Sequence, residues 1–391
     1  MTTTKNNEHK KLNVPNLRFP EFEGEWEKCK LGNIANITGG YAFKSDTLNS
    51  IGGKYQVVKM GNLYQNQLDL HRSPSYTNIL TSKAENVILR KGDIAITLTG
   101  TNNKRDFGYT YIFNDEKNLL LNQRCGLIRT KGDPYFLSCL LKTYAFLNQF
   151  FESATGGTGN QANVSTKAME MFSVNTPSLK EQKKIGELMA LLDERIATQN
   201  KIIDRLQSLI KGIAQHCIKD FTNGCEYVRL GDICKITTGK LDANAQVENG
   251  QYPFFTCAER PFYIDNYAFD TEALLISGNG ANLGYINYYK GKFNAYQRTY
   301  VLDHFSVNIQ YVKWALKVLL PQRIAIEKSS SNTPYIVLST LADLKIPIPN
   351  NSKQNHIADL MMSFERKLST QLALSDLYNK QKQYLLRQMF I

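Results

Sequence analysis

Few side chains in this sequence stand at spacings suited to covalent chemistry. Methyl transfer to an adenine amine would use a loop of the form Asn/Asp-Pro-Pro-aromatic, and the nearest fragment, Thr333-Pro334-Tyr335, lacks the first residue and the second proline. Metal-dependent DNA cleavage would use a Pro-Asp pair followed by Glu-x-Lys. The sequence contains no Pro-Asp, and Glu181-Gln182-Lys183 opens a long helical pattern. The G-x-x-x-x-G-K-[ST] phosphate loop is also absent. We therefore expect a chain that is not itself an enzyme and holds no cofactor.

One glycine-rich segment resembles a nucleotide-binding loop. Residues Gly278 to Gly284 have the form G-x-G-x-x-x-G, one residue longer than the dinucleotide fingerprint, and a strand pattern follows where a helix is required. The segment is therefore either a turn whose backbone amides approach a DNA phosphate or a plain structural turn. The seven cysteines never stand as C-x-x-C. Neither a zinc site nor a disulfide framework is expected.

The charge balance indicates a different kind of chemistry, the binding of a polyanion. Lys and Arg number 47 against 35 Asp and Glu, which gives a net charge of +12, and the positive residues are spread along the chain. This distribution favours nucleic acid over a membrane surface, which would require one basic amphipathic helix. No apolar run reaches the roughly 18 to 20 residues of a membrane-spanning helix, and the first ten residues lack the apolar segment of a signal peptide. We expect a cytoplasmic protein without a membrane partner.

The elements that must position such binding residues occur twice. The length of 391 residues predicts two or three domains. Five matches recur in the same order, and the distance between the copies falls from 199 to 172 residues, so the second copy has lost one block of roughly 25 residues early. The matched segments are Leu31-Gly32-Asn33-Ile34 with Leu230-Gly231-Asp232-Ile233, residues 93–100 with 273–280, Gly108-Tyr109 with Gly284-Tyr285, Gln123-Arg124 with Gln297-Arg298, and residues 165–177 with 339–349.

Each copy follows one plan of elements. Strands punctuated by Gly and Asn turns come first, and an aromatic helix follows. In the first copy this helix has Asp133 as N-cap and Pro134 at its first position, and its pattern runs on to Tyr144. In the second copy it covers residues 309–320 and is stopped or bent by Pro321. A polar loop, at residues 155–161 or 329–334, leads to the last element, a long helix.

The two long helices are the strongest structural signal. Capping boxes are predicted at Ser178-Leu179-Lys180-Glu181 and Asn351-Ser352-Lys353-Gln354, and the apolar heptads that follow predict helix-on-helix packing. Gln199 and Gln371 interrupt the same heptad row, and each either fixes the register of the pair or is a glutamine tolerated near solvent. The rows are Ile185, Leu192, Gln199, Leu206, Ile213 and Met189, Ile196, Ile203, Ile210, Cys217 in one helix, and Ile357, Phe364, Gln371, Tyr378, Leu385 and Met361, Leu368, Ser375, Lys382, Met389 in the other.

The expected fold is α+β, with two similar globular domains separated by a pair of long antiparallel coiled-coil helices and related by a pseudo-twofold axis. We place an N-terminal tail at residues 1–21, the first domain at 22–177, the central helix at 178–222, the second domain at 223–350 and the C-terminal helix at 351–391. The strands of duplex DNA are themselves related by local twofold axes. This layout therefore suits a protein that reads two half-sites at a spacing set by the helices.

The repeat also divides the residues that could contact DNA. Residues shared by the copies should serve the fold or bind phosphates, whereas base readers should stand where the copies differ. Gln123-Arg124 and Gln297-Arg298 are shared, and are either phosphate contacts or an internal structural pair. In the unlike loops, Arg suits guanine, Asn or Gln suits adenine and Lys suits phosphate. These loop candidates are Lys44, Asn102, Asn103, Lys104, Arg105, Asn160 and Gln161 in the first copy, and Arg260, Asn279, Asn282, Asn332 and Thr333 in the second.

The order of these elements resembles a known family. The opening Asn16-Leu17-Arg18-Phe19-Pro20-Glu21-Phe22-Glu23-Gly24-Glu25-Trp26, the two L-G-x-I starts, and the helix entries with Glu181-Gln182 and Lys353-Gln354 are similar to the specificity subunit of bacterial type I restriction-modification enzymes. The resemblance covers the chain from residue 14 onward. The second copy departs from the pattern at Lys353, where the first has Glu181, and in its shortened early block.

The resemblance implies two target recognition domains, each for one half of a split double-stranded DNA site with a nonspecific spacer. It also implies that the helices dock two methyltransferase subunits, which use S-adenosylmethionine, and that restriction subunits using ATP and Mg²⁺ join the full complex. Two other functions stay open from the residues alone. A coiled-coil scaffold whose basic domains bind proteins, or nucleic acid nonspecifically, would show weak and sequence-blind DNA affinity. A self-sufficient methyltransferase would need a cofactor pocket for which the sequence shows no motif.

Overall fold

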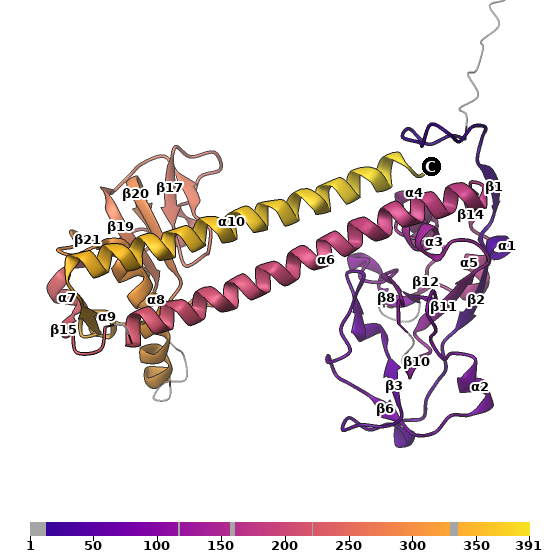
Figure 1. Ribbon diagram of the computed structural model, residues 1–391, viewed down its shortest axis with the longest axis horizontal. Coiled ribbons are helices and arrows are strands. Elements are labelled where there is room, and N and C mark those ends of the chain that lie inside the picture. Colours follow the sequence, from indigo (N-terminus) through magenta and orange to yellow (C-terminus); the bar gives the residue numbers. More distant parts are fainter. Residues whose placement is uncertain (1–12, 116–117, 157–160, 221, 329–334) are drawn as a thin grey trace, which may run out of the picture. The chain divides into compact units, whose positions relative to one another are not determined.

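The structure is a computed structural model of the chain, and it describes residues 13–115, 118–156, 161–220, 222–328 and 335–391. The chain forms two compact units, the first made of Met1–Thr198 with Ser375–Ile391 and the second of Gln199–Leu374. Each unit combines a globular α+β part with segments of the same two long helices (Figure 1). The boundary between the units therefore falls inside both helices.

The first unit builds its domain from short strands packed on short helices. The central antiparallel sheet has the order β2 (Ala35–Gly39), β11 (Cys125–Thr130), β7 (Ile94–Thr97) and β9 (Thr110–Ile112). Two further sheets of the domain have three strands each. In one, β3 (Tyr55–Val58) lies between its parallel neighbour β10 (Leu119–Leu121) and β6 (Tyr76–Thr77). In the other, β13 (Gln161–Asn163) lies between β12 (Thr155–Gly156) and β8 (Thr99–Thr101). The other elements are β1 (Glu27–Lys30) paired with β14 (Ser173–Thr176), the hairpin of β4 (Leu63–Tyr64) and β5 (Gln67–Leu68), and the helices α1 (Leu31–Ile34), α2 (Ser82–Glu85), α3 (Pro134–Leu140), α4 (Tyr144–Glu152) and α5 (Thr166–Glu170).

The second unit gathers its main strands into one sheet. The order is β16 (Lys235–Thr238), β21 (Thr299–Asp303), β19 (Phe269–Ser277), β20 (Ile286–Ala295), β17 (Tyr252–Phe255) and β18 (Phe262–Ile264), and only the pairing of β17 with β20 is parallel. A separate antiparallel pair joins β15 (Glu226–Arg229) to β22 (Lys345–Ile348). The helices of this domain are α7 (Leu230–Ile233), α8 (Ile309–Lys328) and α9 (Leu338–Ala342).

The two domains repeat one backbone plan. The Leu31 amide donates to the Phe172 carbonyl, and the Leu230 amide to the Leu344 carbonyl, each at 2.9 Å. The glycine that follows each leucine, Gly32 or Gly231, lets the short helix α1 or α7 lie against α5 or α9. The predicted internal repeat is therefore confirmed. The hairpin β4–β5 and helix α2 of the first domain have no counterpart in residues 239–268 of the second, which accounts for the shortened early block.

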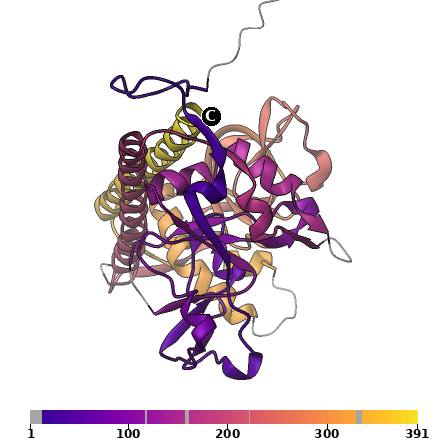
Figure 2. The same cartoon turned by 90° about the vertical axis from the view of Figure 1, so that its right-hand side faces the viewer.

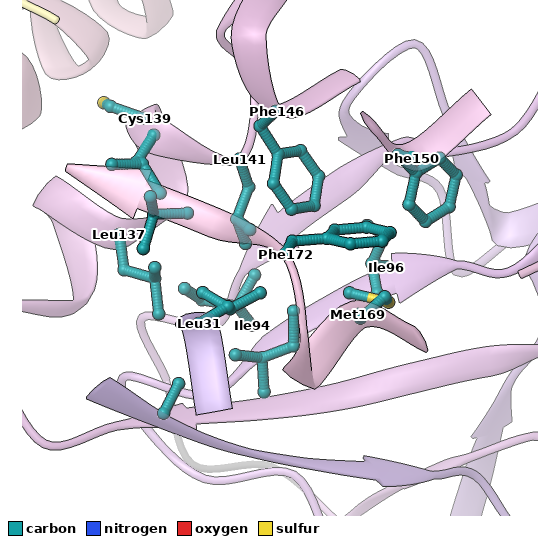
Figure 3. Packing of buried hydrophobic residues seen from close by; sticks show 14 of the residues in the cluster. Leu31, Ile94, Ile96, Leu137, Cys139, Leu141, Phe146, Phe150, Met169 and Phe172 are labelled. Atoms are coloured by element: carbon teal, nitrogen blue, oxygen red, sulfur yellow. The ribbon is translucent and has the colours of Figure 1, made fainter. Parts of the chain in front are cut away.

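The core of the first domain lies between the central sheet and helices α3, α4 and α5 (Figure 3). Strand β7 is buried along its whole length because both of its faces are covered: Ile94 and Ile96 face this core, and Ala95 faces a second cluster on the opposite side of the sheet. Phe146 and Phe150 stack on each other at 5.9 Å between ring centroids and are almost fully buried. Each such side chain stabilises the fold by about 1.5–3 kcal/mol relative to exposure.

The aromatic helices differ from their prediction at two points. In the first domain Asp133 is the N-cap as expected, accepting from the Phe136 amide at 2.8 Å, but the single predicted helix is split into α3 and α4. The Thr143 hydroxyl accepts from the Phe146 amide and starts the second piece. In the second domain α8 does not stop at Pro321 but runs through it to Lys328. Ile324, beyond the proline, still packs on the core of this domain, and this burial offsets the lost backbone hydrogen bond.

The long helices α6 (Leu179–Gln215) and α10 (Asn351–Gln388) confirm the two predicted helices. A π-turn at His216–Asp220 follows α6. Ser178 caps α6 as predicted, but the second cap is Asn350, one residue earlier than expected, because its side chain accepts from the Lys353 amide at 2.9 Å. The helices run antiparallel: Asp193 of α6 pairs with Lys382 of α10 in the first unit, and Gln199 meets Gln371 in the second.

Gln199 is a buried seam residue and not a glutamine near solvent. Its Nε2 donates to Gln371 Oε1 at 2.8 Å and to the Gln371 carbonyl at 3.0 Å, and only 5% of its surface is exposed. Leu192 and Leu206, one heptad away on either side, are also buried. A polar pair inside an apolar row disfavours shifted registers, because a slip would bury one amide without its partner.

Gly212 provides a simple test of the exposed face of α6. It lies in the helix interior, and an added Cβ would meet nothing within 4 Å. We expect Gly212→Ala to raise the free energy of unfolding by about 0.5–1 kcal/mol, because glycine loses more backbone entropy in a helix than alanine does. Urea titration followed by circular dichroism measures the change. Gly186→Ala in the same helix is the control of opposite sign, because its Cβ would overlap the Asp133 carboxylate; stabilisation by both substitutions would contradict this account.

Candidate nucleic-acid interface

A turn formed by Gln123 and Arg124 stands at one end of the first domain, between β10 and β11. Its backbone belongs to the fold: the Gln123 amide donates to the Tyr41 carbonyl at 3.0 Å, and the Leu98 amide donates to the Arg124 carbonyl at 3.0 Å. The Gln123 and Arg124 side chains are both exposed. The turn therefore holds an amide and a guanidinium toward solvent on a fixed backbone.

The second domain holds Gln297 and Arg298 in the same way, between β20 and β21. The Gln297 amide donates to the Leu241 carbonyl at 2.9 Å, and the Gly278 amide donates to the Arg298 carbonyl at 2.8 Å. Both side chains are again exposed. In both turns the backbone atoms are used by the fold, and the Gln and Arg side chains remain available for contact with a ligand.

A glycine lies beneath each of these turns. A Cβ on Gly40 would overlap the carbonyl of Asn122, and a Cβ on Gly239 would overlap the carbonyl of Ala295. In both domains the obstacle is backbone, which cannot rotate away as a side chain can. Glycine is therefore required for the strand to cross so close to the turn.

Candidate residues of the first domain gather beside the Gln123-Arg124 turn. Strand β8 starts one residue after Leu98 and leads into a 3₁₀ turn at Asn102–Lys104. Gln161 of β13 lies directly opposite Thr101 of β8. Because the Leu98 amide binds the Arg124 carbonyl, these loops lie next to one another, and Asn103, Lys104, Arg105 and Gln161 are all exposed. Asn160 lies outside the described residues.

Arg105 and Lys44, two candidate cations of the first domain, have different surroundings. The Arg105 guanidinium lies 5.1 Å from the ring centroid of Phe151, and its backbone has a φ of 46°. Stacking on an aromatic ring restrains the guanidinium without using its hydrogen-bond donors. Lys44 is exposed and precedes a 3₁₀ turn at Ser45–Thr47, in the loop that starts from Tyr41.

Candidate residues of the second domain lie at the Gly278–Gly284 turn and at the loop after β17. Asn279 and Asn282 are half-buried, and both bind Cys257: the thiol donates to Asn279 Oδ1 at 3.0 Å, and Asn282 Nδ2 donates to the Cys257 carbonyl at 3.0 Å. Arg260 is exposed three residues later. The turn passes into strand β20, so the strand expected after it is confirmed. Asn332 and Thr333 lie outside the described residues.

The structure thus brings several of the described candidates together in each domain. In the first domain Gln123, Arg124, Gln161 and the residues 102–105 belong to loops joined by backbone hydrogen bonds. In the second domain Gln297, Arg298 and the 278–284 turn are joined in the same way, and Asn279 and Asn282 act partly within the protein. Each cluster offers guanidinium and amide groups, the types that bind base edges and phosphates.

The sequence interpretation missed the residues that tie each domain to its long helix. Gln182 Oε1 accepts from the Asp133 amide at 3.3 Å and its Nε2 donates to the Pro177 carbonyl at 2.9 Å. In the second unit Gln354 Oε1 accepts from the Asn308 amide at 3.0 Å, and its Nε2 donates to the Pro349 carbonyl at 2.8 Å. Both glutamines are buried. The signal was present as the Gln of the matching helix entries, but its partner, the cap of the aromatic helix, is remote in sequence.

An ion cluster adds a second tie in the second unit. Glu365 of α10 accepts from Lys313 at 2.7 Å and from Lys317 at 2.9 Å, both on α8. Burial favours the neutral form of Glu365, but the two lysines dominate and hold its pKa below the usual value. The domain helix is therefore fixed to the long helix by charge as well as by packing.

Reactive groups are scarce in the described part of the chain. Among those residues no three His, Cys, Asp or Glu side chains come together as a metal site, and no helix is both long and apolar enough to cross a membrane. Burial raises the pKa of Cys125 and Cys234 to about 12 and that of Cys139 to about 11. These three thiols stay protonated near neutral pH and are poor nucleophiles.

Comparison with known proteins finds the same domain family in both halves of the chain. The model of the type I restriction modification DNA specificity domain matches residues 23–208 and again residues 223–374. A similar protein is the type I restriction enzyme EcoDI specificity subunit of Escherichia coli, 43% identical over 146 residues, which are 37% of this chain and 31% of the relative. The MjaIX specificity subunit of Methanocaldococcus jannaschii is 22% identical over 369 residues and 83% of each chain.

A solved structure shows the same fold over nearly the whole chain. The crystal structure of a type I restriction-modification S subunit from M. genitalium superposes with a TM-score of 0.67 at 17% identity, and covers 97% of this chain and 99% of that one. The segments matched in the EcoDI specificity subunit and in the EcoAI specificity subunit, also of Escherichia coli, span about a third of those proteins' length, 31% and 30%. With the family model matched twice, each match containing one Gln-Arg turn and its loops, the chain belongs to the family of type I restriction-modification DNA specificity subunits.

Proposed function

We propose that this chain recognises a two-part site in double-stranded DNA, each domain reading one half, with a nonspecific spacer between the halves. The observation that carries the proposal is the repetition of one backbone frame around an exposed Gln-Arg turn, with unlike loops beside it in the two domains. A common frame with different loops is what two readers of different sequences require, because phosphates are alike at every site and base edges are not.

The residues divide between two tasks. Arg124 and Arg298 stand at equivalent places, so we assign both to DNA phosphates. Lys104 and Lys44 also suit phosphates, while Arg105, Asn103 and Gln161 of the first domain and Arg260 and Asn279 of the second suit base edges in the major groove. Each good bidentate base contact discriminates against a wrong base by about 1–3 kcal/mol.

The chain leaves the chemistry to partner subunits in this proposal. Two methyltransferase subunits would dock on the long helices and supply S-adenosylmethionine, and restriction subunits would supply ATP and Mg²⁺ chemistry in the complete cytoplasmic enzyme. The noncatalytic assignment is supported by the missing methyltransferase and nuclease motifs in the sequence. The antiparallel pairing of α6 with α10 supports a role for these helices in setting the distance between half-sites.

Methylation mapping tests the proposal. The chain should be co-expressed with the methyltransferase subunits of its own operon in a host that lacks other adenine methylation, and the modified sites should be read across the genome. We expect one split motif with a constant spacer. A chain whose residues 26–165 come from a relative should change one half of that motif and keep the other half and the spacer.

Two results would contradict the proposal. A change in both halves after the exchange of residues 26–165 would refute separate reading by the two domains. DNA affinity that is equal for all sequences, with a steep dependence on salt, would favour the scaffold alternative, because counterion release alone gives sequence-blind binding. Substitution of the methyltransferase catalytic loop in the partner subunit is the control for background methylation.

A further inference from the structure

A sulfur-containing side chain joins two loops beside the Gln-Arg turn in each domain. In the first domain the Thr99 hydroxyl donates to the Met60 sulfur at 3.3 Å. In the second domain the Cys257 thiol donates to Asn279 Oδ1 at 3.0 Å. All four residues are half-buried, so the contacts lie at the edge of the candidate interface and not in the core.

The loop positions of Met60 and Cys257 are equivalent. Met60 stands two residues after Val58, the last residue of β3, and Cys257 stands two residues after Phe255, the last residue of β17. These two strands are the parallel partners of β10 and β20, the strands that lead into the Gln-Arg turns. The same position along the fold therefore carries a sulfur atom in both copies.

The partner positions are equivalent as well. Thr99 stands two residues after Thr97, which pairs with Cys125, the residue after the first Gln-Arg turn. Asn279 stands two residues after Ser277, which pairs with Thr299, the residue after the second turn. The geometry is shared, but the chemical pairs differ: thioether with hydroxyl in one domain, and thiol with amide in the other.

Cys257 makes more contacts than Met60. Its carbonyl accepts from Asn282 Nδ2 at 3.0 Å, and its thiol also lies 3.6 Å from the Arg298 carbonyl. One residue thus touches Asn279, Asn282 and the backbone of the Gln297-Arg298 turn. Removing its side chain would delete the thiol contacts to Asn279 and to the Arg298 carbonyl, and would leave the Asn282 bond to the Cys257 carbonyl and the strand pairing in place.

We propose that Cys257 in the second domain, and the Met60–Thr99 pair in the first, are positioning residues that set the conformation of the recognition loops and so the half-site that each domain reads. The inference rests on the proposed function for its DNA part. Its structural part, the tie between two loops, is independent of DNA. The differing pairs occupy a position where the copies differ, as expected of residues that adjust recognition separately in each domain.

Amide hydrogen exchange on the full chain tests the structural part without DNA. Cys257→Ala should speed exchange at residues 279–284 by about two- to tenfold, the factor that corresponds to the loss of one net hydrogen bond. Cys257→Ser keeps a donor and should restore exchange to within about twofold. Cys225→Ala, at another half-buried cysteine of the same unit, is the control. Equal exchange in the wild type and Cys257→Ala would overturn the proposal.

Methylation by the complex with its methyltransferase subunits tests the specificity part. Cys257→Ala should raise methylation of sites mismatched in the second half about fivefold and leave first-half discrimination unchanged. Thr99→Val should raise methylation of sites mismatched in the first half and leave second-half discrimination unchanged. Thr99→Ser is its conservative control. These two variants test the proposal if Cys257→Ala does not fold. Loss in both halves would indicate general destabilisation and overturn the proposal. Absence of any split motif with the wild-type chain would instead refute the proposed function, while the exchange result would still decide the structural part.

Discussion

Replacing Glu181 with alanine is expected to lower the free energy of unfolding by about 3–5 kcal/mol, the usual loss when one member of a buried ion pair is removed. The Glu181 carboxylate has 2% of its side chain exposed. It accepts from Arg18 Nε and Nη2, each at 2.8 Å, and from Trp26 Nε1 at 3.2 Å. The hydrogen bond with Glu181 raises the pKa of Arg18. Without Glu181 this contribution is lost, but an arginine side chain is effectively always protonated, so the guanidinium stays charged and without this partner.

The Glu181 contacts explain the size of this effect, because they hold a segment far from Glu181 in sequence. Arg18 and Trp26 belong to the N-terminal segment that passes over the end of α10, where the Leu17 amide donates to the Gln388 carbonyl at 2.8 Å (Figure 2). The ring of Trp26 packs edge-on against Phe390 at 6.3 Å between centroids. Loss of Glu181 should therefore loosen both the N-terminal segment and the last turn of α10.

Urea unfolding of the full chain measures this prediction. Glu181→Gln keeps oxygen and nitrogen atoms in place without the charge and should lose an intermediate amount. Lys183→Ala, two residues away and exposed, should change stability by no more than about 0.5 kcal/mol. If Glu181→Ala lowered the free energy of unfolding by less than about 1 kcal/mol, the prediction would be contradicted, and the ion pair would contribute little net stability.

Gly239→Ala should lower the stability of the second domain by about 3 kcal/mol and abolish discrimination in the half-site that this domain reads. The added Cβ would overlap the carbonyl oxygens of Ala295 and Tyr296. To accept it, the backbone must move where β20 enters the Gln297-Arg298 turn, and this would displace the exposed side chains of the turn. First-half discrimination should persist.

Two matched variants distinguish the effect of steric overlap from other effects of an added methyl group. Gly40→Ala should produce the mirror result, loss in the first half only, because its Cβ would overlap the Asn122 carbonyl. Gly224 has a φ of 82°, and an added Cβ would meet nothing within 4 Å. Gly224→Ala should therefore show only the cost of backbone strain, about 1–2 kcal/mol, and keep discrimination in both half-sites. Thermal unfolding and methylation of half-site mismatches measure the two effects. Normal second-half discrimination in Gly239→Ala would contradict the frame described for the turn.

Local patterns predicted the parts of the fold that depend on neighbours in sequence. Asp133 caps its helix because an N-cap needs only the three residues that follow it. The heptads of α6 and α10 predicted their pairing, and Gln199 and Gln371 meet as two equivalent positions should in an antiparallel pair. The repeat was visible because both copies keep the same glycines and the same Gln-Arg turn.

Features that depend on remote partners were not predictable in this way. Glu181 was interpreted as half of a capping box, but its carboxylate turns to Arg18, 163 residues away. Pro321 indicated either a helix end or a bend, and packing beyond it keeps α8 continuous. The candidate interface shows the same division. The exposed Arg124 and Arg298 were found from the repeat, whereas the tie from Cys257 to Asn279 joins segments that no spacing relates.

The burial of Leu386, Met389 and Phe390 in the core of the first domain bears on how the protein is made. These residues pack with Trp26, Phe136 and Ile185, the last of which a ribosome would have released about 200 residues earlier. At roughly 5–20 residues per second, that domain waits about 10–40 s for its last core side chains. The second domain, built from the contiguous stretch Gln199–Leu374, has no such delay. The domain synthesised first is therefore completed last, and its apolar surface must be protected during that interval.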